Sequence, residues 1–302
     1  MSTNPCPFSG SMVALVTPFC DGEVDYAALE RLVEEQILGG QSALVPCGST
    51  GESATLSHEE HSEVVRAVIR AARGRVPVIA GTGSNSTREA IRLTREAEES
   101  GAAGALLISP YYNRPTQGGI VEHYRAVAAA TKLPLIVYNI PGRTGSTIEP
   151  QTLARLAEID NIVGLKDSTG SLDRVIDTIA ASGSRLAVFS GDDSLTLPII
   201  AVGGRGVISA LANVVPREMS AMANAALAGS WDEARRRQYD LLDLMRACFL
   251  ETNPIPVKAA LAMLGRCRDE LRLPLLPMSP GPRAQLRAAL LEHKLPVAGA
   301  AA

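Results

Sequence analysis

Short apolar stretches alternate with longer amphipathic ones along most of this sequence. Eight apolar stretches rich in Val, Ile and Leu are each expected to form a buried strand, at residues 11–19, 42–47, 76–81, 104–109, 133–139, 161–166, 185–190 and 205–209. Each precedes a segment with helical periodicity, at 25–38, 57–73, 86–100, 117–130, 149–157, 171–181, 193–201 and 216–228. Strands that alternate with helices imply a parallel sheet, and eight such units predict a closed α/β barrel, the (β/α)8 or TIM barrel, rather than a doubly wound sheet.

Three further helical segments follow the eight units, near 231–249, 254–265 and 281–293, with prolines between them. They are expected to form a C-terminal helical appendage. The predicted organisation is a barrel at residues 1–228, a C-terminal helical region at 229–295 and a loose tail at 296–302.

Composition excludes several classes of partner. The 302 residues are 20% charged with a net charge of −3, so the chain has neither the basic surface that nucleic acid requires nor an acidic tail. No apolar run approaches the length of a membrane span, and the first residues lack the pattern of a secretory signal. The five cysteines form no C-x-x-C pair. These features predict a cytoplasmic protein with reduced thiols that binds small soluble molecules and contacts neither nucleic acid nor membrane.

Lys166 ends an apolar strand, a position where lysine is rare. In a barrel of this type the reactive groups come from the carboxyl ends of the strands. A buried lysine loses its charge more easily, and a neutral amine can condense with a carbonyl as a Schiff base. The alternative is an inert ion pair with Asp167 or with a more distant residue at the end of the barrel. Tyr138 ends the preceding strand, where its phenol can give and take a proton beside the amine, although it can also be a simple packed aromatic.

Other polar groups are expected at the same mouth of the barrel. Gly48-Ser49-Thr50-Gly51 can form a backbone nest for a small carboxylate or a plain turn, and Arg143 can hold a second carboxylate or be merely solvated. Two more groups follow strands, Tyr111-Tyr112-Asn113 and Gly191-Asp192-Asp193. His58 and His61 lie one helical turn apart, but no third ligand is evident, so no metal site is expected.

Seven motifs together resemble the dihydrodipicolinate synthase family, whose members are pyruvate-dependent Schiff-base lyases of the aldolase type. They are GSTGESATLSHEEH, SPYYNRP, YNIPGRTG, GLKDSTG, SGDD, GGRGVIS and ETNPIPVK, in the family's order from about residue 10 to about residue 265. The resemblance implies that Lys166 forms a Schiff base with pyruvate and that no separate cofactor is needed. It also implies condensation of pyruvate with L-aspartate 4-semialdehyde, on the route to diaminopimelate and L-lysine.

The resemblance assigns roles to individual residues. Tyr138, Ser49 and Tyr112 would form a proton relay, with Tyr112 supplied across a subunit interface of a homo-oligomer, usually a tetramer built as a dimer of dimers. Thr50 would hold the pyruvate carboxylate, Arg143 would bind the carboxylate of the semialdehyde, and Gly191 and Ile208 would complete the substrate site. Positions that bind L-lysine as a feedback inhibitor in sensitive members are matched by Ser53, Ala54, His58, His61, Asn85, Glu89 and Tyr111.

One departure keeps alternatives open. Synthases of the family usually carry threonine where this chain has Ser49, and GSTGE is common in sister branches such as N-acetylneuraminate lyase and keto-deoxy sugar acid aldolases. Serine keeps the hydroxyl but lacks the methyl group that restricts its rotamer. Arg143 favours the synthase, because the sialate lyase branch lacks that arginine. A non-catalytic paralogue that binds an oxoacid is the third hypothesis.

Overall fold

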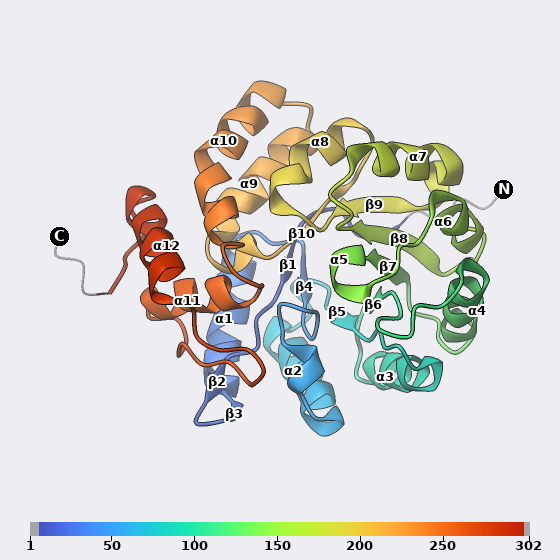
Figure 1. Cartoon of the computed structure of the whole chain (residues 1–302), viewed down its shortest axis with the longest axis horizontal. Coiled ribbons are helices and arrows are strands. Elements are labelled where there is room, and N and C mark those ends of the chain that lie inside the picture. The colour runs from blue at the N-terminus through green and yellow to red at the C-terminus, as the bar shows by residue number, and fades with distance from the viewer. Residues whose placement is uncertain (1–5, 299–302) are drawn as a thin grey trace.

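Eight parallel strands form a closed ring at the centre of the computed structural model, which describes residues 6–298 (Figure 1). They are β1 (Gly10–Ala14), β4 (Ala43–Val45), β5 (Ile79–Gly81), β6 (Gly104–Ile108), β7 (Leu135–Asn139), β8 (Ile162–Asp167), β9 (Ala187–Ser190) and β10 (Gly206–Ser209). Each strand pairs with its neighbours, and a bridge between Leu44 and Val78 joins β4 to the chain entering β5. The predicted eight-stranded barrel is therefore confirmed.

A helix follows every strand of the ring and covers its outer face. These helices are α1 (Tyr26–Leu38), α2 (His58–Ala72), α3 (Thr87–Glu99), α4 (Gln117–Ala128), α6 (Pro150–Leu156), α7 (Leu172–Ser182), α8 (Thr196–Ala201) and α9 (Pro216–Leu227). Five of them begin at a side chain that accepts a hydrogen bond from the first turn, namely Asp25, Ser57, Ser86, Thr116 and Ser171. Each cap fixes where the preceding loop ends, and those loops form the mouth of the barrel.

Several short elements were not predicted as separate elements. A hairpin of β2 (Phe19–Cys20) and β3 (Glu23–Val24) follows β1, and α5 (Pro141–Thr144) follows β7. Four 3-10 turns are η1 (Ser53–Thr55), η2 (Gly183–Arg185), η3 (Asp193–Leu195) and η4 (Leu211–Asn213). Elements of two to four residues are too short to show a hydrophobic period, so the sequence pattern does not reveal them.

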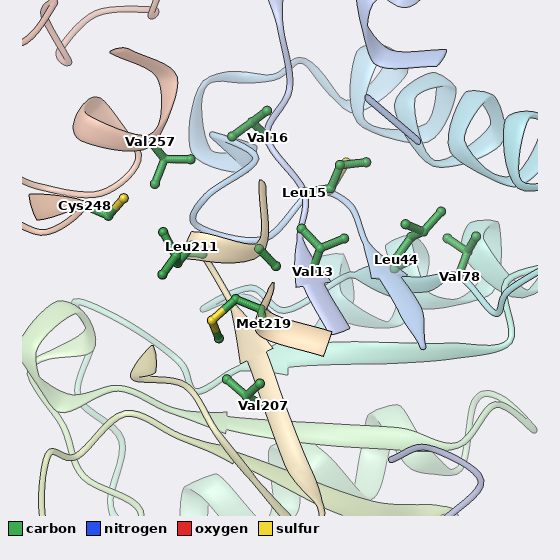
Figure 2. Close-up of a cluster of buried hydrophobic side chains, with 14 of the residues drawn as sticks. Val13, Leu15, Val16, Leu44, Val78, Val207, Leu211, Met219, Cys248 and Val257 are labelled. Carbon is green, nitrogen blue, oxygen red and sulfur yellow. The ribbon is translucent and has the colours of Figure 1, made fainter. Parts of the chain in front are cut away.

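Apolar side chains form two layers because neighbouring residues of a strand point to opposite faces. Met12 lies in a cluster inside the ring, and the adjacent Val13 lies in a larger cluster between the strands and the helices. Figure 2 shows part of this outer cluster, in which Val13, Leu44 and Val207 from three strands gather with Met219 of α9. The inner cluster fills the barrel, so ligands are confined to its ends.

Three C-terminal helices, α10 (Trp231–Ala247), α11 (Ile255–Met263) and α12 (Pro280–Glu292), lie beside the barrel (Figure 1). Cys248 and Val257 belong to the same outer cluster as the barrel strands (Figure 2). One buried cluster therefore runs through the barrel and the C-terminal helices. The predicted division of the chain at residue 228 stays a prediction. The predicted loose tail is wrong for its first residues, since Val297 is 6% exposed and the Ala298 N–H donates to the Met263 carbonyl at 2.8 Å. Residues 299–302 lie outside the described range.

Candidate active site at the carboxyl ends of the strands

Lys166 lies inside the barrel near the carboxyl end of β8. Its neighbour Leu165 packs into the outer cluster, so the alternation of the strand turns Lys166 toward the interior. The residue is 6% exposed. Burial lowers the pKa of its ammonium group from 10.5 to about 8. At pH 7 about one amine in ten is then neutral, instead of about one in 3,000, which meets the main requirement for a lysine nucleophile.

Two aspartates at the end of β9 oppose this effect. The carboxylates of Asp193 and Asp192 favour the ammonium form and raise the pKa of Lys166, whereas burial lowers it by more. Burial raises the pKa of Asp192 to about 6 and also raises the pKa of Asp193. The Leu211 N–H donates to Oδ2 of Asp193 at 3.0 Å, which fixes that carboxylate in place. Because burial outweighs the two carboxylates, the pKa of Lys166 stays near 8, and the amine can exchange a proton close to neutral pH.

Tyr138 lies directly beside Lys166 on the neighbouring strand β7. The two residues are paired in the sheet register, and Nζ of Lys166 lies 4.3 Å from the centre of the Tyr138 ring. Burial raises the pKa of the phenol to about 12. The phenol therefore keeps its proton at neutral pH and can donate it to an oxygen that develops next to the amine. The structure brings together the two residues that the sequence placed at adjacent strand ends.

Gly191 follows β9, and Ile208 lies in β10. A side chain at Gly191 would collide with Oγ of Ser168, and its Cβ would lie 3.0 Å from Cε of Lys166. Glycine at this position therefore keeps open the space beside the amine. Ile208 of β10 is fully buried in the inner cluster, and its part in the substrate site stays a prediction.

A cavity of about 430 Å³ opens at this end of the barrel. Three of the predicted catalytic and substrate-binding residues line it, namely Ser49, Tyr138 and Arg143. Its size lies in the range of sites for small molecules. Lys166 does not itself line the cavity, but Tyr138, which does, contacts its amine, so the cavity adjoins the candidate substrate site around Lys166.

The loop that carries Ser49 and Thr50 is tightly held. The Thr17 hydroxyl donates to the Gly51 carbonyl at 2.8 Å, and Thr50 is 3% exposed. A side chain at Gly81 of β5 would collide with the backbone of this loop. The packing fixes Ser49 at the cavity wall, and the predicted carboxylate nest stays a prediction.

Arg143 approaches the cavity from α5, the short helix that sequence periodicity did not reveal. Its Nη2 donates to the backbone carbonyl of Asn253 at 2.7 Å. The Asn253 side chain in turn donates to Oγ1 of Thr50 at 2.9 Å. Sequence reasoning gave Asn253 no role, because it lies about 200 positions from Thr50 and outside the barrel strands. Its motif, ETNPIPVK, was the one available signal.

Tyr112 does not face the cavity of its own chain. It is 89% exposed, with a backbone φ of +69°, and its N–H donates to the Thr144 carbonyl at 3.2 Å. The adjacent Tyr111 is 37% exposed and does line the cavity. The expectation that both tyrosines point into one mouth is therefore wrong for Tyr112, because the left-handed backbone at that residue separates the two side chains. Its entry into a partner's site stays a prediction.

The residues matched to the L-lysine site form one group beside the candidate substrate site. All but Asn85 line the same cavity, namely Ser53, Ala54, His58, His61, Glu89 and Tyr111. Asn85 adjoins them, because its side-chain amide donates to the Tyr111 carbonyl at 3.2 Å. Nε2 of His58 lies 2.6 Å from Oε1 of Glu89. The group therefore offers a carboxylate, an imidazole and backbone carbonyls to an amino-acid ligand.

The two histidines have protein partners in place of a metal. His58 contacts Glu89, and Nε2 of His61 hydrogen-bonds the Gly81 carbonyl at 2.8 Å, while burial lowers the pKa of the His61 ring. Between residues 6 and 298, no group of three or more His, Cys, Asp or Glu side chains is placed to hold a metal ion. In the same range, no helix is long and apolar enough to cross a membrane.

Comparison with known proteins identifies the family. A family model described as "Dihydrodipicolinate synthetase family" matches residues 7–293. The chain belongs to this family. The 4-hydroxy-tetrahydrodipicolinate synthase of Geobacter sulfurreducens is 53% identical and matches 95% of this chain and 99% of its own length. The crystal structure of dihydrodipicolinate synthase from Aquifex aeolicus has a TM-score of 0.95 at 50% identity, covering 97% of this chain and 100% of the other.

Two further family structures contain small molecules. The dihydrodipicolinate synthase of Acinetobacter baumannii, described as complexed with pyruvate, is 47% identical with a TM-score of 0.94 and covers 95% of this chain and 99% of its own. The enzyme of Cyanidioschyzon merolae, described with lysine bound, is 42% identical with a TM-score of 0.92 and the same two coverages. The names of these relatives favour the synthase over the sugar-acid alternatives that Ser49 had left open.

Proposed function

We propose that this protein is an aldolase-type lyase that catalyses the 4-hydroxy-tetrahydrodipicolinate synthase reaction, the condensation of pyruvate with L-aspartate 4-semialdehyde in L-lysine and diaminopimelate biosynthesis. The observation that carries the proposal is the buried Lys166, whose pKa of about 8 and contact with Tyr138 suit a Schiff-base lysine. Membership of the family supports it, as do the names of the relatives at about 53% identity. The lysine itself supplies the covalent chemistry, and the reaction needs no separate cofactor.

The reaction begins when the neutral amine of Lys166 attacks the ketone carbon of pyruvate. The carbinolamine that forms loses water to give a Schiff base, and loss of a methyl proton gives an enamine. The enamine carbon adds to the aldehyde of the semialdehyde. The amine of the second substrate then displaces Lys166 and closes the six-membered ring. Tyr138 donates and accepts the protons that these steps require.

The other residues of the site bind and orient the two substrates. Ser49 extends the relay from Tyr138, and Tyr112 of the partner subunit completes it. Thr50 and the backbone around it hold the pyruvate carboxylate, and Arg143 binds the carboxylate of the semialdehyde. Gly191 and Ile208 shape the space around the lysine-bound intermediate.

Regulation and assembly belong to the same proposal. L-lysine would bind the group around His58 and Glu89, where its ammonium and carboxylate would find polar partners, and would inhibit the enzyme. The lysine-bound family structure supports this assignment. The exposure of Tyr112 supports an assembly of at least two chains, with a tetramer of paired dimers as the proposed form. The proposed location is the cytoplasm.

The experiment that tests the proposal is pyruvate consumption in the presence and absence of L-aspartate 4-semialdehyde, with the native protein and Lys166→Ala. We expect consumption only with both substrates and only in the native protein. Borohydride added with pyruvate should increase the native mass by one reduced pyruvate adduct and leave Lys166→Ala unchanged. A native protein that neither consumes nor traps pyruvate would refute the proposal.

A further inference from the structure

Asn253 joins two parts of the site that come from distant segments. It follows α10 and immediately precedes the segment that begins α11, and it is 8% exposed at the cavity wall. Its side-chain nitrogen Nδ2 donates to Oγ1 of Thr50 at 2.9 Å. Its backbone carbonyl accepts a hydrogen bond from Nη2 of Arg143 at 2.7 Å. One residue of the C-terminal region thus contacts both groups that are proposed to bind substrate carboxylates.

The bond to Thr50 has a direction with chemical consequences. A hydroxyl has one proton, and when its oxygen accepts a hydrogen bond the proton is free to point elsewhere. With Asn253 as the donor, Thr50 keeps its own O–H free to donate to a substrate carboxylate. An acceptor in the same place would take that proton and leave the ligand without it.

The two ends of the Asn253 amide have different surroundings. Oδ1 is buried and has no hydrogen-bond partner among residues 6–298. An unpaired buried oxygen is costly, and this is a cost of the amide orientation in which the nitrogen faces Thr50. The nitrogen faces Thr50, so the Thr50 hydroxyl is the group to which the amide donates its hydrogen bond.

The segment that carries Asn253 is anchored by a buried ion pair. Lys258 of α11 is fully buried, and its Nζ lies 2.5 Å from Oε1 of Glu52 and donates to the Glu270 carbonyl at 2.7 Å. Glu52 comes two residues after Thr50, at a backbone φ of +51°. The same stretch of chain therefore meets the Ser49–Thr50 loop twice, and Asn253 has little freedom to move away from Thr50.

We propose that Asn253 is a positioning residue that turns the Thr50 hydroxyl toward the pyruvate carboxylate and holds Arg143 through its backbone carbonyl. The inference rests on the proposed function and adds to it a contribution of the C-terminal region to substrate binding. Because the carbonyl is present in every variant at this position, changes in the side chain act on Thr50 and leave the bond to Arg143 in place.

The test compares Asn253→Ala with the native protein in steady-state kinetics. We expect the KM for pyruvate to rise about tenfold, as for the loss of a buried hydrogen-bond donor, and the KM for the semialdehyde to stay within about twofold. In a Thr50→Val background, Asn253→Ala should add no further rise, because the hydroxyl on which it acts is gone. Equal increases in the two backgrounds would overturn the proposal.

A second variant tests the direction of the bond. Asn253→Asp replaces the donor with an acceptor, so its KM for pyruvate should exceed that of Asn253→Ala and fall again at low pH, where the introduced carboxyl is protonated and can donate. An unchanged KM would mean that Thr50 donates to the amide oxygen, which would also overturn the proposal. Asn161→Asp is the matched control, since its amide donates to the Ala128 carbonyl at the opposite end of β8. It should leave the KM for pyruvate unchanged.

Borohydride trapping separates this inference from the function on which it rests. A native protein that neither consumes nor traps pyruvate overturns the proposed function and the role of Asn253 together. A native protein that traps pyruvate, with the same half-saturating pyruvate concentration in Asn253→Ala, overturns only the role of Asn253. Thermal unfolding shows whether each variant folds. If Asn253→Ala fails to fold, the comparison of Asn253→Asp with the native protein decides.

Discussion

Replacing Lys166 with methionine should stabilise the folded protein at neutral pH. Burial lowers the pKa of Lys166 from 10.5 to about 8, because the barrel interior disfavours the ammonium form. That difference in pKa corresponds to roughly 3 kcal/mol in the free energy of unfolding. The folded protein is less stable by this amount at any pH where Lys166 is protonated in both the folded and the unfolded chain. Methionine has a similar length and no charge to bury, so Lys166→Met should raise the free energy of unfolding at pH 7 by up to about 3 kcal/mol.

The sign of the pH dependence follows from the two pKa values. Below about pH 8 the folded and unfolded chains both bind the proton, and the full penalty applies. Between about 8 and 10.5 the unfolded chain binds more protons than the folded one, so the native protein gains stability as pH rises. The advantage of Lys166→Met should therefore shrink to about 1 kcal/mol at pH 10.

Urea unfolding at pH 7 and pH 10 measures this difference, with the concentration of protein held constant because assembly also contributes to stability. Lys132→Met, at an exposed position, is the control and should change stability little at either pH. The reasoning is refuted if Lys166→Met is no more stable than the native protein at pH 7, or if its advantage is the same at both pH values.

Three further predictions concern the surroundings of the site. Lys258→Met leaves the carboxylate of Glu52 buried without its partner, so urea unfolding should show a loss of about 3–5 kcal/mol. Gly191→Ala brings a Cβ into Ser168 and toward the side chain of Lys166, and the rate of pyruvate trapping should fall at least about tenfold. Glu89→Gln removes the carboxylate that an ammonium ligand would meet, so the L-lysine concentration for half inhibition should rise about tenfold or more.

Two of these predictions have a matched control in the chain. A Cβ at Gly281, on α12, would meet no atom within 4 Å, so Gly281→Ala should trap pyruvate at the native rate. Glu99→Gln, at an exposed position near the end of α3, should leave inhibition by L-lysine unchanged. A loss below about 1 kcal/mol in Lys258→Met, native trapping in Gly191→Ala or native inhibition in Glu89→Gln would contradict the corresponding argument.

The barrel is predictable from the sequence because each of its strands is buried on both faces. Such strands read as short runs of Val, Ile and Leu, and the helices between them carry an apolar face with a different period. The β2–β3 hairpin and α5 escaped prediction for the opposite reason. They bury few side chains, and their geometry comes from local turns that carry no hydrophobic pattern.

The site was predictable where its residues come from strand ends. Lys166 and Tyr138 sit at equivalent positions of neighbouring parallel strands, so the order of the strands alone places them side by side. Asn253 and the Lys258–Glu52 pair were not predictable, because their contacts depend on how the C-terminal helices pack against the barrel mouth. The direction of Tyr112 was also hidden, since nothing in the sequence requires a tyrosine to adopt a positive φ.

The contacts of the C-terminal region explain why the barrel alone would be an incomplete enzyme. Lys166 and Tyr138 are positioned by strand register, which is rigid and needs no outside support. Thr50 and Arg143 lie on loops, and their known restraints include Asn253, a residue beyond the last barrel helix. The proposed catalysis needs the amine of Lys166 and the proposed carboxylate-binding groups in one fixed arrangement. Loss of the C-terminal contacts should therefore weaken substrate binding before it affects the chemistry of the lysine.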